Sequence, residues 1–96
     1  MRSRFSAFVV GDEDYLFRSW HPRTRPEGPY CDPCVAWEAL EVHEVEAGGP
    51  GDDAGVVTFT ARYRTSLPDG VVRSGMLRER SAFVRRRGRW VYLDSL

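Results

Sequence analysis

Two cysteines separated by two residues are the most conspicuous candidates for chemistry in this chain. Cys31 and Cys34 enclose an Asp-Pro pair, and this Cys-x-x-Cys spacing is typical of redox sites and of zinc sites. The preceding segment is rich in Pro and Gly and lacks the strand and helix that activate a thioredoxin-type thiol. A structural zinc ion needs four ligands, so the two cysteines would need His21 and His43 as the other two. Three interpretations stay open: incidental reduced thiols, zinc ligands, or a disulfide or redox pair. We expect no cofactor, with zinc as the alternative.

A histidine at the end of an expected helix is the main candidate for acid–base chemistry. His21 lies between Trp20 and Pro22. Because imidazole titrates near neutral pH, this side chain in a cavity would serve as an acid, a base or a ligand group. The alternative is a structural role, in which it binds a backbone carbonyl at the helix end and benefits from the helix dipole. We expect Trp20 to belong to the core.

A carboxylate on an otherwise apolar strand face is the second candidate. Residues 76–85 read as part of a strand, and the residues on one face of it are Leu77, Glu79, Ser81 and Phe83. Desolvation raises the pKa of a carboxylate in such surroundings unless a partner compensates. Arg62 or Arg80 would be that partner, and the pair would then be structural.

Two residues of the expected last strand, Tyr92 and Asp94, are also able to reach a cavity. No Ser-His-Asp order, phosphate-binding Gly loop or paired-carboxylate motif is present, so no catalytic residue is assigned. The candidate ligand-binding residues of a cavity are Trp20, His21, Arg25, Glu79 and Tyr92.

Two short helices are expected to precede the strands. Apolar residues at i, i+3 and i+4 predict a helix over 4–10, which Gly11 ends. Asp12 is a suitable N-cap for a second helix, and its apolar face continues through Trp20 to Pro22.

Four strands are expected after a Pro-rich crossing loop. Residues 35–45 fit a helix by propensity and a half-exposed strand by alternation, and we favour the strand. The later expected strands are 56–64, 71–85 and 90–94. Gly75 is a candidate bulge, and Arg87-Gly88 closes a hairpin. Helices followed by consecutive strands predict an α+β fold with an antiparallel sheet, in one domain over residues 1–96.

Charge is segregated along the chain, although its formal net value is zero. Residues 27–56 hold eight acidic residues and no Arg, whereas residues 57–96 hold nine Arg and three acidic residues. The arginines form a basic strip on the outer sheet face, which we expect to be solvated. Nucleic-acid binding is disfavoured because the aromatic side chains alternate toward the opposite side. No apolar run approaches the roughly 20 residues that cross a membrane, and we expect a cytoplasmic protein.

Several strings resemble the main domain of the YchJ family. They are Arg2-Ser3-Arg4-Phe5-Ser6-Ala7-Phe8, Gly11-Asp12, Tyr15-Leu16, Trp20-His21-Pro22, Thr24-Arg25-Pro26, Glu79-Arg80-Ser81-Ala82-Phe83 and Gly88-Arg89-Trp90-Val91-Tyr92. The resemblance spans nearly the whole chain. It implies an NTF2-like fold, in which a strongly curved sheet of about four strands wraps against two short helices and encloses a conical cavity. It implies no reaction, because the family is known mainly as uncharacterised.

Many members of that family carry a Cys-rich zinc-binding segment before this domain, of the kind found at the end of the SecA translocation motor. This sequence starts at Met1, where the helical domain begins. Either the segment is absent or Met1 is an internal methionine, so zinc binding is not transferred from that segment.

Three functional hypotheses follow. The leading one is a non-enzymatic accessory or binding domain for a small ligand or a protein, with a homodimer through the sheet face as an additional expectation. The second is a small enzyme that uses His21 with Glu79 or Asp94 as acid and base. The third is a zinc or redox module on Cys31 and Cys34. The fold alone does not choose among them.

Overall fold

The computed structural model describes all 96 residues and has two helices followed by four strands. The elements are α1 (Arg2–Val10), α2 (Glu13–Arg18), β1 (Val35–Ala47), β2 (Ala54–Ser66), β3 (Val72–Arg86) and β4 (Arg89–Ser95). The strands form one antiparallel sheet in the order β1-β2-β3-β4. The expected α+β fold is confirmed, and the ambiguous segment after residue 34 is a strand.

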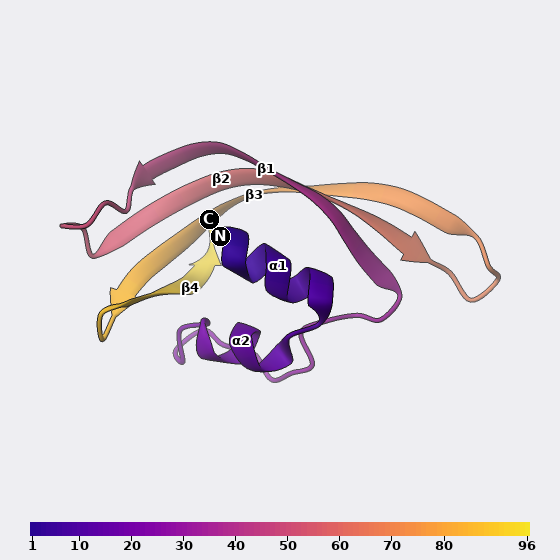
Figure 1. Ribbon diagram of the computed structural model, residues 1–96, viewed down its shortest axis with the longest axis horizontal. Coiled ribbons are helices and arrows are strands. Elements are labelled where there is room, and N and C mark those ends of the chain that lie inside the picture. Colours follow the sequence, from indigo (N-terminus) through magenta and orange to yellow (C-terminus); the bar gives the residue numbers. More distant parts are fainter.

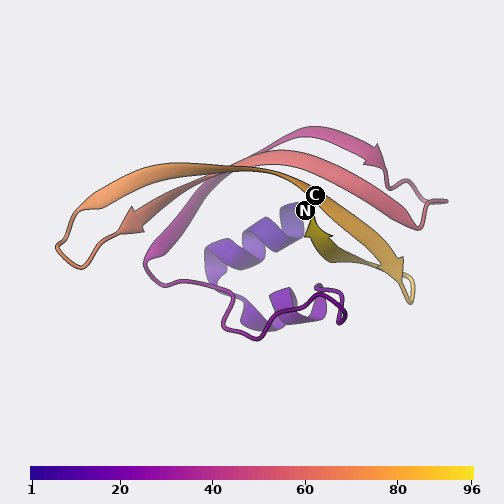
Figure 2. The same cartoon turned by 180° about the vertical axis from the view of Figure 1, so that it is seen from behind.

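The sheet arches over the helices, as Figure 1 shows, with α1 beneath its concave face and α2 further from it. Figure 2 shows from behind that the far end of the β2–β3 hairpin extends beyond both helices. Neither helix has the length and apolar character needed to cross a membrane.

Short-range signals set the end of α1 and the start of α2 as expected. Gly11 ends α1 in the left-handed conformation, with φ of 73°, which glycine adopts without steric cost. The Asp12 carboxylate caps α2 by accepting a hydrogen bond of 3.0 Å from the Tyr15 N–H.

Helix α2 ends two residues before Trp20, earlier than the sequence predicts. The following backbone pairs with β4 instead, since the His21 N–H donates to the Tyr92 carbonyl at 2.8 Å and the Tyr92 N–H donates to the Ser19 carbonyl at 2.7 Å. His21 is therefore not a helix-terminal residue. This long-range pairing aligns residues 19–21 beside the last strand.

The predicted bulge at Gly75 is wrong, because the register between β2 and β3 is continuous through this residue. The irregularities lie between β1 and β2 and between β3 and β4. Gly75 has a different role, since a Cβ atom at this position would lie 2.5 Å from Cζ of Tyr63. The glycine makes room for the tyrosine ring on the neighbouring strand.

The core is small, and its buried apolar residues come from α1, α2 and three strands. They are Ala7, Leu16, Phe59, Ala61, Phe83 and Val91. The space between α1 and the concave sheet face is not completely filled, and this unfilled space contains the candidate site.

Candidate functional site

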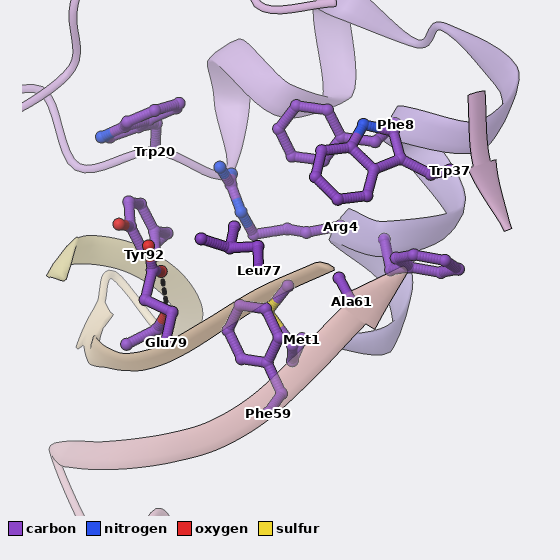
Figure 3. Close-up of a pocket in the computed structure, with 12 residues that line it drawn as sticks. Met1, Arg4, Phe8, Trp20, Trp37, Phe59, Ala61, Leu77, Glu79 and Tyr92 are labelled. Carbon is purple, nitrogen blue, oxygen red and sulfur yellow. Dashed lines mark hydrogen bonds between the residues drawn. The ribbon is translucent and has the colours of Figure 1, made fainter. Parts of the chain in front are cut away.

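A cavity of about 180 Å³ lies between α1 and the concave face of the sheet. Nine of its twelve lining residues are hydrophobic. The lining residues are Met1, Arg4, Phe5, Phe8, Trp20, Trp37, Phe59, Ala61, Leu77, Glu79, Ser81 and Tyr92. Figure 3 shows that the polar side chains gather at the end of the cavity near Trp20 and Tyr92, whereas Phe8 and Trp37 lie at the other end.

Arg4 is the central polar residue of this site. Its side chain projects from α1 and is only 4% exposed. Nη1 donates to the Leu16 carbonyl at 3.3 Å and to Ser19 Oγ at 2.7 Å. The Nε and Nη2 groups donate to no protein atom, so three of the five N–H donors of this guanidinium are without a partner.

Two adjacent aromatic rings lie against the guanidinium. Cζ of Arg4 lies 4.9 Å from the ring centroid of Trp20 and 4.8 Å from that of Tyr92, which is within the range of cation–π attraction. Burial lowers the pKa of Arg4 to about 10, while Tyr92, Tyr15 and Glu79 oppose this shift. Arg4 therefore stays positively charged at neutral pH.

Tyr92 contributes a protonated phenol to the same end of the cavity. The pKa of this phenol is raised to about 12, mainly by burial and additionally by the negative charges of Glu79 and Asp94. Trp20 stacks edge-on against Tyr92 at a centroid distance of 5.0 Å. The indole Nε1–H of Trp20 is buried and has no hydrogen-bond partner.

Glu79 lines the cavity from β3, on the apolar face where the strand alternation places it. The prediction that Arg62 or Arg80 pairs with Glu79 is wrong. Arg80 pairs with Glu46 at 2.7 Å, and Arg62 forms no ion pair with Glu79. The Glu79 carboxylate instead accepts a hydrogen bond from the Ser81 hydroxyl. Ser81 is completely buried, so the pair forms a fixed polar element of the cavity wall.

The structure places three of the five candidate ligand residues in the wall of the cavity, namely Trp20, Glu79 and Tyr92. His21 and Arg25 lie outside it. His21 Nδ1 accepts a hydrogen bond from the Arg23 backbone N–H at 3.0 Å, and no hydrogen bond joins His21 to Glu79.

The acid–base arrangement of the enzyme hypothesis is not assembled. Asp94 is exposed, and its Oδ1 accepts from the Ser95 backbone N–H at 2.9 Å. His21 makes no hydrogen bond with Asp94 either. The structure thus separates the imidazole from both carboxylates that were expected to work with it.

The two cysteines are free thiols on the loop before β1. Glu13 of α2 fixes this loop by accepting hydrogen bonds from the backbone N–H groups of Tyr30 and Cys31, at 2.8 and 2.7 Å. Burial and the Glu13 carboxylate raise the pKa of Cys31 to about 11, which keeps this thiol protonated and weakly nucleophilic at neutral pH.

No group of three or more His, Cys, Asp or Glu side chains in the structure is arranged to hold a metal ion. His43 is engaged elsewhere, because its Nε2 lies 2.7 Å from Thr60 Oγ1. The two histidines are therefore not brought to the cysteine pair.

The profile described as the YchJ middle, NTF2-like domain matches residues 1–95. The chain belongs to this family. A UPF0225 protein of Streptomyces coelicolor is 47% identical over 94 residues, which cover 98% of this chain and 68% of that protein. For a UPF0225 protein of Streptomyces avermitilis the identity is 48%, over 98% of this chain and 61% of the relative. A third, from Chromobacterium violaceum, is 43% identical over 100% of this chain and 70% of its own length.

A solved structure also resembles this YchJ-family domain. The solution structure of RPA3114, described as a SEC-C motif containing protein from Rhodopseudomonas palustris, is 27% identical. It matches 100% of this chain and 73% of its own with a TM-score of 0.77. The NTF2-like fold is confirmed, and the names of the UPF0225 relatives state no activity.

Arg4 is the residue of this YchJ-family domain that sequence reasoning missed. It appeared only within the string that carries the resemblance, as one of many arginines. One signal was available, since Arg4 immediately precedes Phe5 and lies one turn before Phe8, both of which line the cavity. An arginine on the apolar face of a helix is a candidate for a buried polar site.

Proposed function

We propose that this domain is a binding module for a small ligand with an apolar body and one hydrogen-bond-accepting end. The observation that supports this proposal is the buried, incompletely hydrogen-bonded Arg4 guanidinium at one end of an otherwise apolar cavity. Among side-chain polar atoms, only Trp20 Nε1 is fully buried without a partner, so the free Arg4 donors reach the open cavity, where they donate to water or to an acceptor supplied by a ligand.

The size of the cavity limits the ligand to about one ring with a short substituent. An apolar cavity of about 150 Å³ accommodates benzene, and the present one is about 180 Å³. Phe5, Phe8 and Trp37 would contact the apolar body. Its polar end would lie near Arg4 and the Tyr92 hydroxyl.

The sign of the ligand's charge follows from the two charged residues of the wall. Glu79 already accepts the Ser81 hydroxyl proton and forms no ion pair with Arg4, whereas Arg4 has donors to spare. Acceptors, and carboxylates above all, make the strongest hydrogen bonds to guanidinium. A cationic ligand would instead compete with Arg4 for the same space.

Three ring compounds test the proposal: benzoate, benzyl alcohol and benzylamine, which share a phenyl ring and differ in the end group. We expect NMR titration to shift resonances of cavity residues in the affinity order benzoate, benzyl alcohol, benzylamine. Arg4→Met should reduce the advantage of benzoate over benzyl alcohol from about tenfold to near unity, since a hydrogen bond to a charged group is worth about 1.5–3 kcal/mol.

A cavity-filling variant supplies the second arm. Ala61 is 2% exposed and lines the cavity, so Ala61→Leu should weaken binding of all three compounds at least about tenfold. Ala36→Leu adds the same atoms at an exposed position of β1 and should leave binding unchanged. The proposal fails if no compound shifts the cavity resonances, or if Ala36→Leu weakens binding as much as Ala61→Leu.

We further propose that the domain acts in the cytoplasm, where the reduced thiols of Cys31 and Cys34 would persist. Pairing of two copies through the outer sheet face stays a prediction. Two ion pairs within the chain already use part of the charge on that face, namely Arg64 with Glu38 at 3.4 Å and Arg80 with Glu46 at 2.7 Å.

A further inference from the structure

Five arginine side chains surround a second concavity, of about 280 Å³, which shares Trp20 with the first. These residues, which we call the arginine groove, are Arg18, Arg25, Arg86, Arg87 and Arg89. Pro22 and Val91 also line it, and none of its eight lining residues is acidic. The arginines come from α2, the loop after it and the β3–β4 hairpin, so the fold gathers positive charge from distant parts of the sequence.

The hairpin supplies three of these side chains in a geometry that costs stability. Arg86 and Arg89 lie directly opposite each other in the β3–β4 register, and like charges at such positions repel. Arg87 has φ of 53°, in the left-handed region where Asn, Asp or Gly is favoured in a two-residue hairpin turn. Neither turn geometry nor pairing explains arginine at these positions.

These hairpin arginines have no compensating partner within the chain. Arg18 pairs with Asp14 at 2.8 Å, and Arg25 lies over the Phe17 ring at 3.6 Å and donates to the Phe17 carbonyl. Arg86, Arg87 and Arg89, in contrast, form no ion pair and no side-chain hydrogen bond. Their guanidinium donors remain available to an anion.

We propose that the arginine groove binds the phosphate group of a small phosphorylated molecule. Guanidinium groups bind phosphate oxygens in bidentate pairs, and several of them converging on one concavity suit a compact polyanion. A single-stranded nucleic acid would need open aromatic faces for base stacking. The Trp20 ring here is already packed against Arg4, Tyr30 and Tyr92.

Titration with pyrophosphate and with inorganic phosphate, followed by NMR at low salt, tests this inference. We expect saturable shifts of groove residues, with pyrophosphate binding more tightly than phosphate. Arg86→Gln combined with Arg89→Gln should weaken pyrophosphate binding about tenfold or more. Arg73→Gln, an exposed and unpaired arginine near the opposite end of β3, is the matched control and should change affinity less than about twofold.

A further variant separates binding from folding. Arg87→Asn removes one positive charge while placing a favoured residue at the left-handed position, so it should weaken pyrophosphate binding without lowering the melting temperature. The inference is overturned if pyrophosphate gives no saturable shifts, or if Arg73→Gln weakens binding as much as the groove variants. It is also overturned if only single-stranded RNA or an acidic peptide binds at the groove.

Discussion

Arg4 of α1 and Tyr92 of β4 come from opposite ends of the chain and meet with the guanidinium carbon 4.8 Å from the phenol ring centroid. The Trp20 ring, whose centroid lies 5.0 Å from that of Tyr92, contacts the same guanidinium at 4.9 Å. This contact joins the first helix to the last strand at the polar end of the cavity. If the domain binds a ligand as proposed, one residue would affect both stability and ligand selection.

Replacement of Arg4 should separate the cost of its charge from the value of its packing. Arg4→Met retains most of the side-chain volume and removes a buried charge whose compensation is incomplete, so we expect the free energy of unfolding to stay unchanged or rise by up to about 2 kcal/mol. Arg4→Ala also leaves empty space and should lower it by about 3 kcal/mol. Urea denaturation measures both values. Equal destabilisation by the two variants would show that the fold requires the charge itself.

Gly75→Ala should destabilise the β2–β3 pair, because the added Cβ would lie 2.5 Å from the Tyr63 ring. Overpacking of this kind costs about 1–3 kcal/mol, measurable by thermal or urea unfolding. Gly51→Ala is the control, since no atom lies within 4 Å of a Cβ at that position. Tyr63→Leu should recover part of the loss in the double variant, and no recovery would contradict the steric explanation.

Glu13 predicts a specific pH dependence of stability. The hydrogen bond that it accepts from the Tyr30 N–H, followed by its interaction with the Cys31 thiol and the bond from the Cys31 N–H, lowers the pKa of this carboxyl in the folded state. A depressed folded pKa gives stability that is present above the unfolded pKa and is lost as the pH falls through the folded pKa.

Glu13→Gln should therefore lower the melting temperature at neutral pH, and the difference from the unaltered chain should shrink below about pH 4. Thermal unfolding monitored by circular dichroism across this range tests the prediction. Glu27→Gln, at an exposed residue without side-chain hydrogen bonds or ion pairs, is the control. A difference that persisted unchanged into acid would show that the Glu13 charge is not its source.

Cys31 should react slowly with iodoacetamide. Because its pKa is raised from 9.0 to about 11, the thiolate fraction at pH 8 is about 100-fold below that of an unperturbed thiol, and the rate should fall in proportion. Mass spectrometry of peptides after timed alkylation measures the rate. Glu13→Gln should accelerate the reaction, since Glu13 contributes to the shift. Rapid alkylation of Cys31 in the unaltered chain would revive the redox hypothesis for this pair.

Local patterns in the sequence predicted the elements well. Gly11 and Asp12 define the junction of the helices through backbone conformation and side-chain capping, which depend on neighbouring residues alone. The alternation in β2 and β3 likewise placed Glu79 on the inner face, because the period of a strand is a local property.

The composition of the site was harder to predict, since it depends on contacts between distant segments. Arg4 is buried because Ser19 and Tyr92 close over it, and nothing near Arg4 in the sequence indicates that closure. His21 was predicted at a helix end, whereas pairing of its backbone with β4 ends the helix earlier. The arginine groove depends on the same pairing, since the hairpin must lie beside the loop that follows α2.

The backbone pairing of residues 19–21 with β4 has a consequence for the behaviour of the protein in concentrated solution. An uncovered edge strand offers free N–H and carbonyl groups to other chains and promotes aggregation. Here the backbone N–H and carbonyl of Tyr92, on the outer side of the last strand, are hydrogen-bonded to the Ser19 carbonyl and the His21 N–H. At the opposite edge, β1 carries two register irregularities and exposed glutamates, among them Glu44 and Glu46. Strand addition is thereby hindered at Tyr92 and along β1, whereas residues 72–79 of β3 have no strand partner on the β4 side.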